Sequence, residues 1–379
     1  MRKGNKMTRT ARSSLWLLAL LVGTAMTLSA CGGGGSADGG AKKVKLGVLL
    51  LGNGADDYLN LGFRVAANKA ADEVGRDKVD LKFVSGVGYN PQATALTEQL
   101  FRQGTQVVVD NLSLQQLFYD ACAKYPDRIC QEEYTLGKVP ENTSGFWWKF
   151  WQGYYLEGVA AGMLSKTGVI GYLASFKQNY ENAHMNALAL GCQSVNPDCK
   201  VKSVIINNWY DAAKSTSAAE TLVNSGADVL AQFVDDTSSV VVARKMSTPS
   251  RPVWGFGLHL TQAKFGGDSY VTSMLTAAAT QKEITLGLRA ALKGEKPPKG
   301  PRVYGIGQGM SLGEWGPKVP KEVQDRVAGI EQEIADGKNV FVGPIYDSKG
   351  KLRVPEGESL TDKYMYASWD WRVRGVTGG

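Results

Sequence analysis

The sequence predicts an α/β fold in which parallel sheets form two lobes. From residue 44 onward, short runs rich in β-branched residues alternate with longer amphipathic segments, which is typical of strand–helix–strand units with right-handed crossovers. This rhythm breaks at residues 135–148, and a second set of units follows. The body of roughly 335 residues is also longer than a typical single domain, which favours two of them.

The expected strands are short and apolar, and the expected helices lie between them. The strands cover residues 44–51, 79–84, 106–111, 169–174, 200–208, 228–234 and 253–258, and the helices cover 59–73, 91–103, 114–124, 151–165 and 212–224. A further helix at 278–292 is expected to return to the first lobe, and the Pro- and Gly-rich segment 293–302 to lead out again. We therefore expect one lobe at 44–145 plus about 272–300, and the other at 146–271 plus about 301–379.

The amino terminus has the pattern of a bacterial lipoprotein signal. Five basic residues precede an apolar run at 15–28, and Leu28-Ser29-Ala30-Cys31 follows as the cleavage point. The run has about 14 residues, whereas a transmembrane helix needs roughly 20. We expect residues 1–30 to be the signal, Cys31 to carry a lipid, and 31–43 to be a flexible tether on the extracytoplasmic face of the cell membrane.

Removing residues 1–30 changes the charge of the chain. The segment holds five basic residues and no acidic one, so the formal net charge falls from +7 to +2. A chain so near neutrality, without a cluster of Lys and Arg interleaved with aromatics, gives no footprint for nucleic acid.

Four further cysteines occupy positions that suit disulfides in an oxidising compartment. We expect Cys122 to pair with Cys130 and Cys192 with Cys199, although three connectivities are formally possible and four buried thiols remain an alternative. Neither spacing is C-x-x-C, so no metal site is expected.

Five sequence blocks occur in order along the chain: Trp151-Gln152-Gly153-Tyr154-Tyr155-Leu156-Glu157-Gly158, Asn186-Ala187-Leu188-Ala189-Leu190-Gly191, Asn208-Trp209-Tyr210-Asp211, Gly226-Ala227-Asp228-Val229 and Phe341-Val342-Gly343-Pro344-Ile345-Tyr346-Asp347. Together these blocks resemble the basic membrane protein family, the PnrA-like ABC-transporter solute-binding lipoproteins. The resemblance implies a type I periplasmic-binding fold with a cleft between the lobes and a permease and ATPase as partners. It also implies a nucleoside ligand, with its base between aromatic rings and its ribose on carboxylates.

The resemblance and the topology together give candidate ligand-binding residues. Trp209 stands where the family carries an aromatic ring over the base, and Asp57, Tyr58 and Asn60 occupy a shorter form of the family's first loop. Ligands of parallel sheets sit at the carboxyl ends of strands. Residues at or just after the carboxyl ends of the expected strands are therefore further candidates for ligand binding. They are Asp110, Asn111, Phe176, Asn179, Asp235, Asp236 and His259. For the acidic residues, capping of the following helix is the alternative.

Two features of the candidate site do not follow directly from the family resemblance. His259 stands where nucleoside-binding relatives tend to carry an acid for the ribose, so a free base or another solute class stays open. The aromatic cluster Phe146, Trp147, Trp148, Phe150 and Trp151 lies at the crossing between lobes, where we expect most rings in the core and one, Trp151 among the candidates, at the cleft.

We do not expect this sequence to encode an enzyme. There is no H-E-x-x-H and no P-loop, and Gly52-Asn53-Gly54 lacks the third glycine of a dinucleotide loop. We expect a monomeric, lipid-anchored solute-binding protein of an ABC importer that uses no cofactor and captures a nucleoside or nucleobase by hinge closure. The alternatives are a ligand-presenting sensor for a membrane receptor, or a binding protein for a sugar or another solute.

Overall fold

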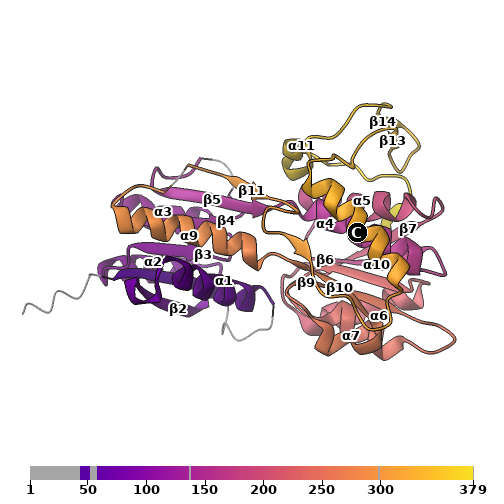
Figure 1. The fold of residues 1–379 in the computed structure, drawn as a ribbon, viewed down its shortest axis with the longest axis horizontal. Coiled ribbons are helices and arrows are strands. Elements are labelled where there is room, and N and C mark those ends of the chain that lie inside the picture. The colour runs from indigo at the N-terminus through magenta and orange to yellow at the C-terminus, as the bar shows by residue number, and fades with distance from the viewer. Residues whose placement is uncertain (1–42, 52–57, 136–137, 298, 379) are drawn as a thin grey trace, which may run out of the picture. The chain divides into compact units, whose positions relative to one another are not determined.

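The computed structural model describes residues 43–51, 58–135, 138–297 and 299–378, in which two large sheets dominate (Figure 1). The strand order of the first sheet is β11-β5-β4-β3-β1-β2, and its strand pairings are parallel. Its strands are β1 Val44–Leu51, β2 Val79–Val87, β3 Val107–Asp110, β4 Ile129–Glu133, β5 Thr143–Trp148 and β11 Arg302–Tyr304.

The second sheet has the order β12-β10-β9-β8-β6-β7-β15. Its strands are parallel except for the short β12, which runs antiparallel to β10. They are β6 Val169–Ala174, β7 Lys200–Ile205, β8 Val229–Phe233, β9 Trp254–His259, β10 Tyr270–Leu275, β12 Ser311–Leu312 and β15 Val376–Gly378. A separate antiparallel pair joins β13 Ile345–Tyr346 to β14 Leu352–Val354.

Helices connect the strands and cover the sheets, so the predicted two-lobed α/β fold is confirmed. They are α1 Leu59–Val74, α2 Gln92–Arg102, α3 Gln116–Lys124, α4 Phe150–Leu164, α5 Asn179–Gln193, α6 Ala212–Asn224, α7 Ser238–Met246, α8 Ala263–Gly266, α9 Ala277–Lys293, α10 Lys321–Ala335 and α11 Asp362–Ala367. The late helix α9 packs along α1 of the first sheet, as Figure 1 shows.

The largest difference from the sequence reading lies at residues 129–148. Residues 135–148, which we expected to interrupt the strand–helix pattern, contain β5. The strand β4, which was not expected, precedes them, and both strands belong to the first sheet. β11 also joins the first sheet, and β10 joins the second. We therefore propose that the first lobe extends to about residue 148 and also takes in β11.

A close helix pair sets the geometry of the second lobe. The backbones of α4 and α5 approach so closely that a Cβ at Gly158 would lie 2.2 Å from the carbonyl oxygen of Leu188, and one at Gly191 would lie 2.0 Å from that of Tyr155. Only glycine fits at such contacts. The two helices bring aromatic residues of their amino-terminal halves, including Phe150 and Tyr180, into one buried cluster.

Both expected disulfides are present. Cys122–Cys130 joins α3 to β4 with a Cα–Cα distance of 6.3 Å, and Cys192–Cys199 joins α5 to the segment before β7 with a distance of 6.0 Å. Each bond closes a short loop next to a strand of its sheet.

The described helices include none with the length and apolar character to span a bilayer. The predicted signal, the predicted lipid attachment site Cys31, residues 31–42 of the predicted tether and the Gly52–Asp57 segment fall outside the described residues.

Candidate functional site

A cavity of about 320 Å³ lies where the carboxyl ends of strands from both sheets meet. This volume falls within the range of small-molecule sites, which runs from roughly 300 to 1,000 Å³. Its described lining consists of Leu51, Leu59, Tyr89, Asn111, Leu112, Ser113, Gln115, Glu133, Tyr134, Trp147, Phe150, Phe176, Gln178, Tyr180, Trp209, Phe233, Asp235 and His259. The position agrees with the rule that parallel sheets bind ligands at this edge.

Five of the candidates proposed from the sequence line this cavity. Asn111 follows β3, Phe176 follows β6, Trp209 follows β7 and Asp235 follows β8, while His259 ends β9. The structure thus brings together side chains that are up to 148 positions apart in the sequence, from 111 to 259.

The remaining described candidates stand outside the cavity lining; they are Tyr58, Asn60, Asp110, Trp151, Asn179 and Asp236. Asp110 caps the loop after β3, since its two carboxylate oxygens accept hydrogen bonds from the backbone N–H of Leu112 (2.9 Å) and Leu114 (2.8 Å). Asp236 accepts a similar bond from the N–H of Ser238 (2.8 Å). Asp236 thus bonds the first residue of α7, in agreement with the capping alternative, whereas Asp110 bonds loop residues that precede α3.

The other four candidates have structural surroundings of their own. Asn60 ties α1 to the end of β1 through both its amide atoms and Leu51, and its oxygen accepts a 2.8 Å bond from Asn111. Asn179 donates to the carbonyl of Ala367 (3.0 Å), and the ring of Tyr58 lies 6.2 Å from that of Tyr210. Trp151 is fully buried and lines a different cavity. Asp57 lies outside the described residues.

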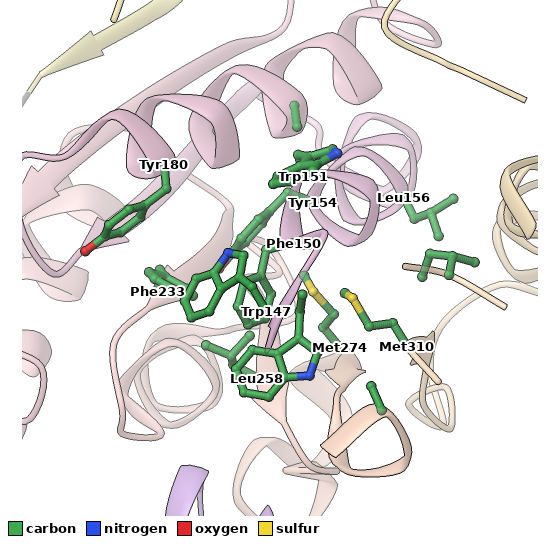
Figure 2. Close-up of a cluster of buried hydrophobic side chains, with 14 of the residues drawn as sticks. Trp147, Phe150, Trp151, Tyr154, Leu156, Tyr180, Phe233, Leu258, Met274 and Met310 are labelled. Carbon is green, nitrogen blue, oxygen red and sulfur yellow. The ribbon is translucent and has the colours of Figure 1, made fainter. Parts of the chain in front are cut away.

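The sequence analysis missed most of the aromatic residues that line the cavity. Trp147, Phe150, Tyr180 and Phe233 form one cluster in Figure 2, with ring centroids 5.4 Å apart for Trp147–Phe150 and 5.0 Å apart for Phe150–Phe233. Tyr134 joins them at 4.4 Å from Trp147. The one available signal was the aromatic run at the crossing, in which Trp147 and Phe150, and not Trp151, reach the cavity.

Backbone strain concentrates at this cavity. Ser113, Gln115, Tyr134 and His259 line it with φ values of +56°, +53°, +55° and +66°. The other described non-glycine residue with positive φ, Asn207, stands two positions before Trp209. Such conformations disfavour L-residues and collect at binding sites, where the surrounding fold holds them.

The ionisable groups at the cavity are acidic. Glu133 and Asp235 line it, and no Lys or Arg does so among the described residues. Burial raises the pKa of Glu133 well above its usual range, and the negative charges of Asp235, Asp110 and Glu132 add to this effect.

His259 contributes a neutral ring. Burial lowers its pKa to about 3, because the apolar surroundings disfavour the imidazolium. Its Nδ1 lies 3.2 Å from the hydroxyl of Thr276, and its Nε2 lies 3.7 Å from an Asp235 carboxylate oxygen. The imidazole can therefore offer a hydrogen bond at the cavity without adding charge.

The buried acids make a prediction about pH. Burial raises the pKa of Asp110 to about 7 and that of Glu132 to about 9, so the native state keeps protons that the unfolded chain loses above about pH 4.5. Stability should therefore fall as pH rises through these values. We expect the Tm to be lower at pH 9 than at pH 5.5 by roughly 5 °C.

Glu132→Gln isolates this contribution. Glutamine keeps the oxygen that accepts the 2.6 Å bond from the N–H of Gln115 but cannot ionise. Thermal unfolding at both pH values should give a smaller Tm difference for this variant than for the unaltered protein. An equal difference in the two proteins would contradict the prediction.

Comparison with known proteins places the chain among transport proteins. The family model described as ABC transporter substrate-binding protein, PnrA-like, matches residues 69–304. The chain is similar to a purine-binding protein of Brucella abortus, with 27% identity over 334 residues that cover 87% of this chain and 92% of that protein. It is also similar to a putative ABC transporter glucose-binding protein of Haloferax volcanii, with 29% identity over 328 residues that cover 84% and 78%.

A solved structure shares the fold. A solute-binding protein of an ABC transporter system from Conexibacter woesei matches with a TM-score of 0.59 and 22% identity, covering 78% of this chain and 97% of that one. The two-lobed arrangement of parallel sheets is therefore common to both proteins.

Proposed function

The chain belongs to the PnrA-like family of ABC transporter substrate-binding proteins, and from this premise we propose that its cavity binds a nucleoside or a nucleobase. As a member of this family it is an extracytoplasmic binding protein and not an enzyme. The proposal concerns the chemical class of the solute.

The observation that carries the proposal is the aromatic lining. Eight aromatic side chains line the cavity among the described residues. Tyr134 and Trp147 come from strand ends of the first sheet, whereas Phe176, Trp209 and Phe233 come from the second. A flat heteroaromatic ring can stack between such surfaces, and each stacked ring contributes about 0.5–1.5 kcal/mol beyond its buried area.

Tyr89 and Trp209 are the best placed rings to close on the solute. Both also line a shallower neighbouring cavity together with Leu51, Phe176 and Tyr210, so they stand where the two cavities adjoin. Tyr89 follows β2 of the first sheet and Trp209 follows β7 of the second. We propose that hinge closure of the lobes brings these rings together on the base.

Polar groups supply the hydrogen bonds that fix the solute. Asn111 and Gln178 carry amides, which both donate and accept, and Asp235 accepts from ribose hydroxyls or exocyclic amines. The relative from Brucella abortus is described as purine-binding, in agreement with this class.

A sugar is the second candidate, because the relative from Haloferax volcanii is described as a putative glucose-binding protein. Acids, amides and one or two aromatic rings also suit a hexose. The eight-ring lining favours the heterocycle, since a hexose offers little flat surface to so many rings.

Delivery completes the proposed function. We propose that the closed, loaded protein docks on a permease that an ATPase drives, and that the lipid on Cys31 keeps the protein at the membrane.

A thermal-shift screen tests the solute class. The purified chain is first unfolded in denaturant without reductant and refolded, which removes any solute that co-purifies. Adenosine, guanosine, adenine, hypoxanthine, ribose and glucose are then added at millimolar concentration. A ligand at one hundred times its Kd stabilises by about 2.7 kcal/mol, which corresponds to a rise in Tm of roughly 5 °C.

The outcomes separate the two solute classes. A rise with the nucleosides or bases, with none from glucose or ribose, supports the proposal. A rise with glucose and none with any purine compound overturns it in favour of a sugar.

A further inference from the structure

The cavity differs from the other charged cavities of the described chain in the sign of its charges. The cavity beside α10 contains Lys149 and Lys338 with Asp362, and the one at the amino end of β1 contains Lys43, Lys45 and Arg128 with Asp80. Both signs occur in each of them. The candidate site contains Glu133 and Asp235 and, within its described lining, no Lys or Arg.

Glu133 has no protein partner that would balance a charge. Glu133 is 6% exposed and lines the cavity. No group of the described residues donates a hydrogen bond to its carboxyl. The acids behind it are arranged differently. Asp110 accepts two backbone N–H bonds and Glu132 accepts one. Of these three neighbouring acids, Glu133 is the one that lines the cavity, and its carboxyl can bind a ligand there.

Aromatic rings surround the same space. Tyr134 directly follows Glu133, and its ring lies 4.4 Å from Trp147 and 5.3 Å from Tyr180. The negative faces of aromatic rings attract cations by about 0.5–2 kcal/mol when water is excluded. The aromatic rings and the acidic side chains of the cavity thus both favour a positively charged ligand.

We infer that the solute of this protein is a heteroaromatic cation, with its positive charge held among Glu133, Asp235 and the neighbouring rings. The inference rests on the proposed function and adds the charge of the solute to it. A cation supplies a counter-charge to Glu133, whose carboxyl lines the cavity without a hydrogen-bond donor among the described residues, whereas a neutral ligand supplies none. An anionic solute such as a nucleotide would meet like charge on the same wall.

Pairs of methylated heterocycles that differ by one proton, and therefore in charge, test this inference. 1-Methyladenosine is protonated and cationic at neutral pH, and N6-methyladenosine, with its methyl group on the exocyclic nitrogen, is neutral. 1-Methylnicotinamide, also a cation, and the neutral N-methylnicotinamide form a second pair without ribose. Isothermal titration calorimetry on the refolded full chain should give affinities at least about tenfold higher for the cation of a pair.

Variants assign the preference to Glu133. Glu133→Gln keeps the size of the side chain and removes its charge, and we expect the ratio of cation to neutral affinity to fall to near one. Glu141→Gln is the matched control, because Glu141 has a side chain that is 78% exposed and does not line the cavity. This control should keep the ratio of the unaltered protein.

The outcomes distinguish this inference from the proposed function. Equal affinities for the cationic and the neutral compound of a pair would overturn the charge inference and leave heteroaromatic binding in place. An unchanged ratio of these affinities in Glu133→Gln would do the same. Binding of glucose, with no binding of any heterocycle, would overturn the proposed function and the inference with it.

Discussion

Replacement of Glu283 by alanine should lower the free energy of unfolding by about 3–5 kcal/mol. Glu283 lies on α9 with a fully buried side chain, and its carboxylate accepts a 2.7 Å bond from Nε of Arg302 on β11. It also accepts bonds from the hydroxyls of Tyr304 (2.9 Å) and Ser144 (3.1 Å) and from the amide of Gln131 (3.1 Å). Its removal takes this acceptor from the hydroxyls of Tyr304 and Ser144 and takes the counter-charge of Glu283 from the partly buried Arg302 guanidinium, whereas the amide of Gln131 keeps its 2.6 Å bond to the backbone carbonyl of residue 283.

Two further variants sharpen this measurement. Glu283→Gln keeps an oxygen for one donor but loses the charge, so its loss should be smaller. Glu73→Ala removes an ion pair between Glu73 of α1 and Arg289 of α9, in which the side chains are 39% and 55% exposed, together with the bonds that Glu73 accepts from Gln281 and Thr285 of α9. Because these contacts are partly exposed to solvent, the loss should be clearly smaller than that of Glu283→Ala. Unfolding by guanidinium, followed by circular dichroism with the disulfides intact, measures all three. A loss for Glu283→Ala no larger than that of Glu73→Ala would show that the buried network contributes little.

The same network explains what the sequence could and could not predict about the fold. Apolar, β-branched strands such as Val107–Asp110 and Val229–Phe233 follow the expected pattern closely. β4 does not, because three of its five residues are Gln131, Glu132 and Glu133. Gln131 bonds to Glu283 of α9, Glu132 holds the loop at Gln115, and Glu133 faces the cavity. A strand with polar side chains in such roles hides the periodicity on which sequence reading depends.

The candidate site could be predicted to the level of strand ends. The rule for parallel sheets led to Asn111 and Asp235, which line the cavity. It also led to their neighbours Asp110 and Asp236, whose carboxylates instead accept backbone N–H groups. Adjacent polar residues at a strand end point in different directions, and the local loop decides which of them caps and which faces the cavity. That choice depends on backbone conformation, which spacing alone does not encode.

Replacement of Trp209 by alanine should weaken the binding of adenosine by about 10- to 100-fold. Trp209 lines the cavity, and its ring makes edge-to-face contacts with Phe176 at 5.4 Å and Phe233 at 5.6 Å. The variant loses the stacking surface of the indole and leaves its two aromatic neighbours less firmly placed. Trp209→Phe keeps a ring and should lose less than about tenfold. Isothermal titration calorimetry with adenosine measures the affinities.

A surface aromatic provides the control for this experiment. Tyr346 is 39% exposed on β13 and lies outside the cavity lining, so Tyr346→Ala should leave the affinity for adenosine unchanged. Because Trp209 is only partly buried, Trp209→Ala should still fold, and its Tm without ligand checks this directly. Unchanged affinity in a folded Trp209→Ala protein would remove this ring from the binding site. The base would then have to stack on other rings of the lining, such as Tyr89 or Phe176, and closure of the lobes would not depend on Trp209.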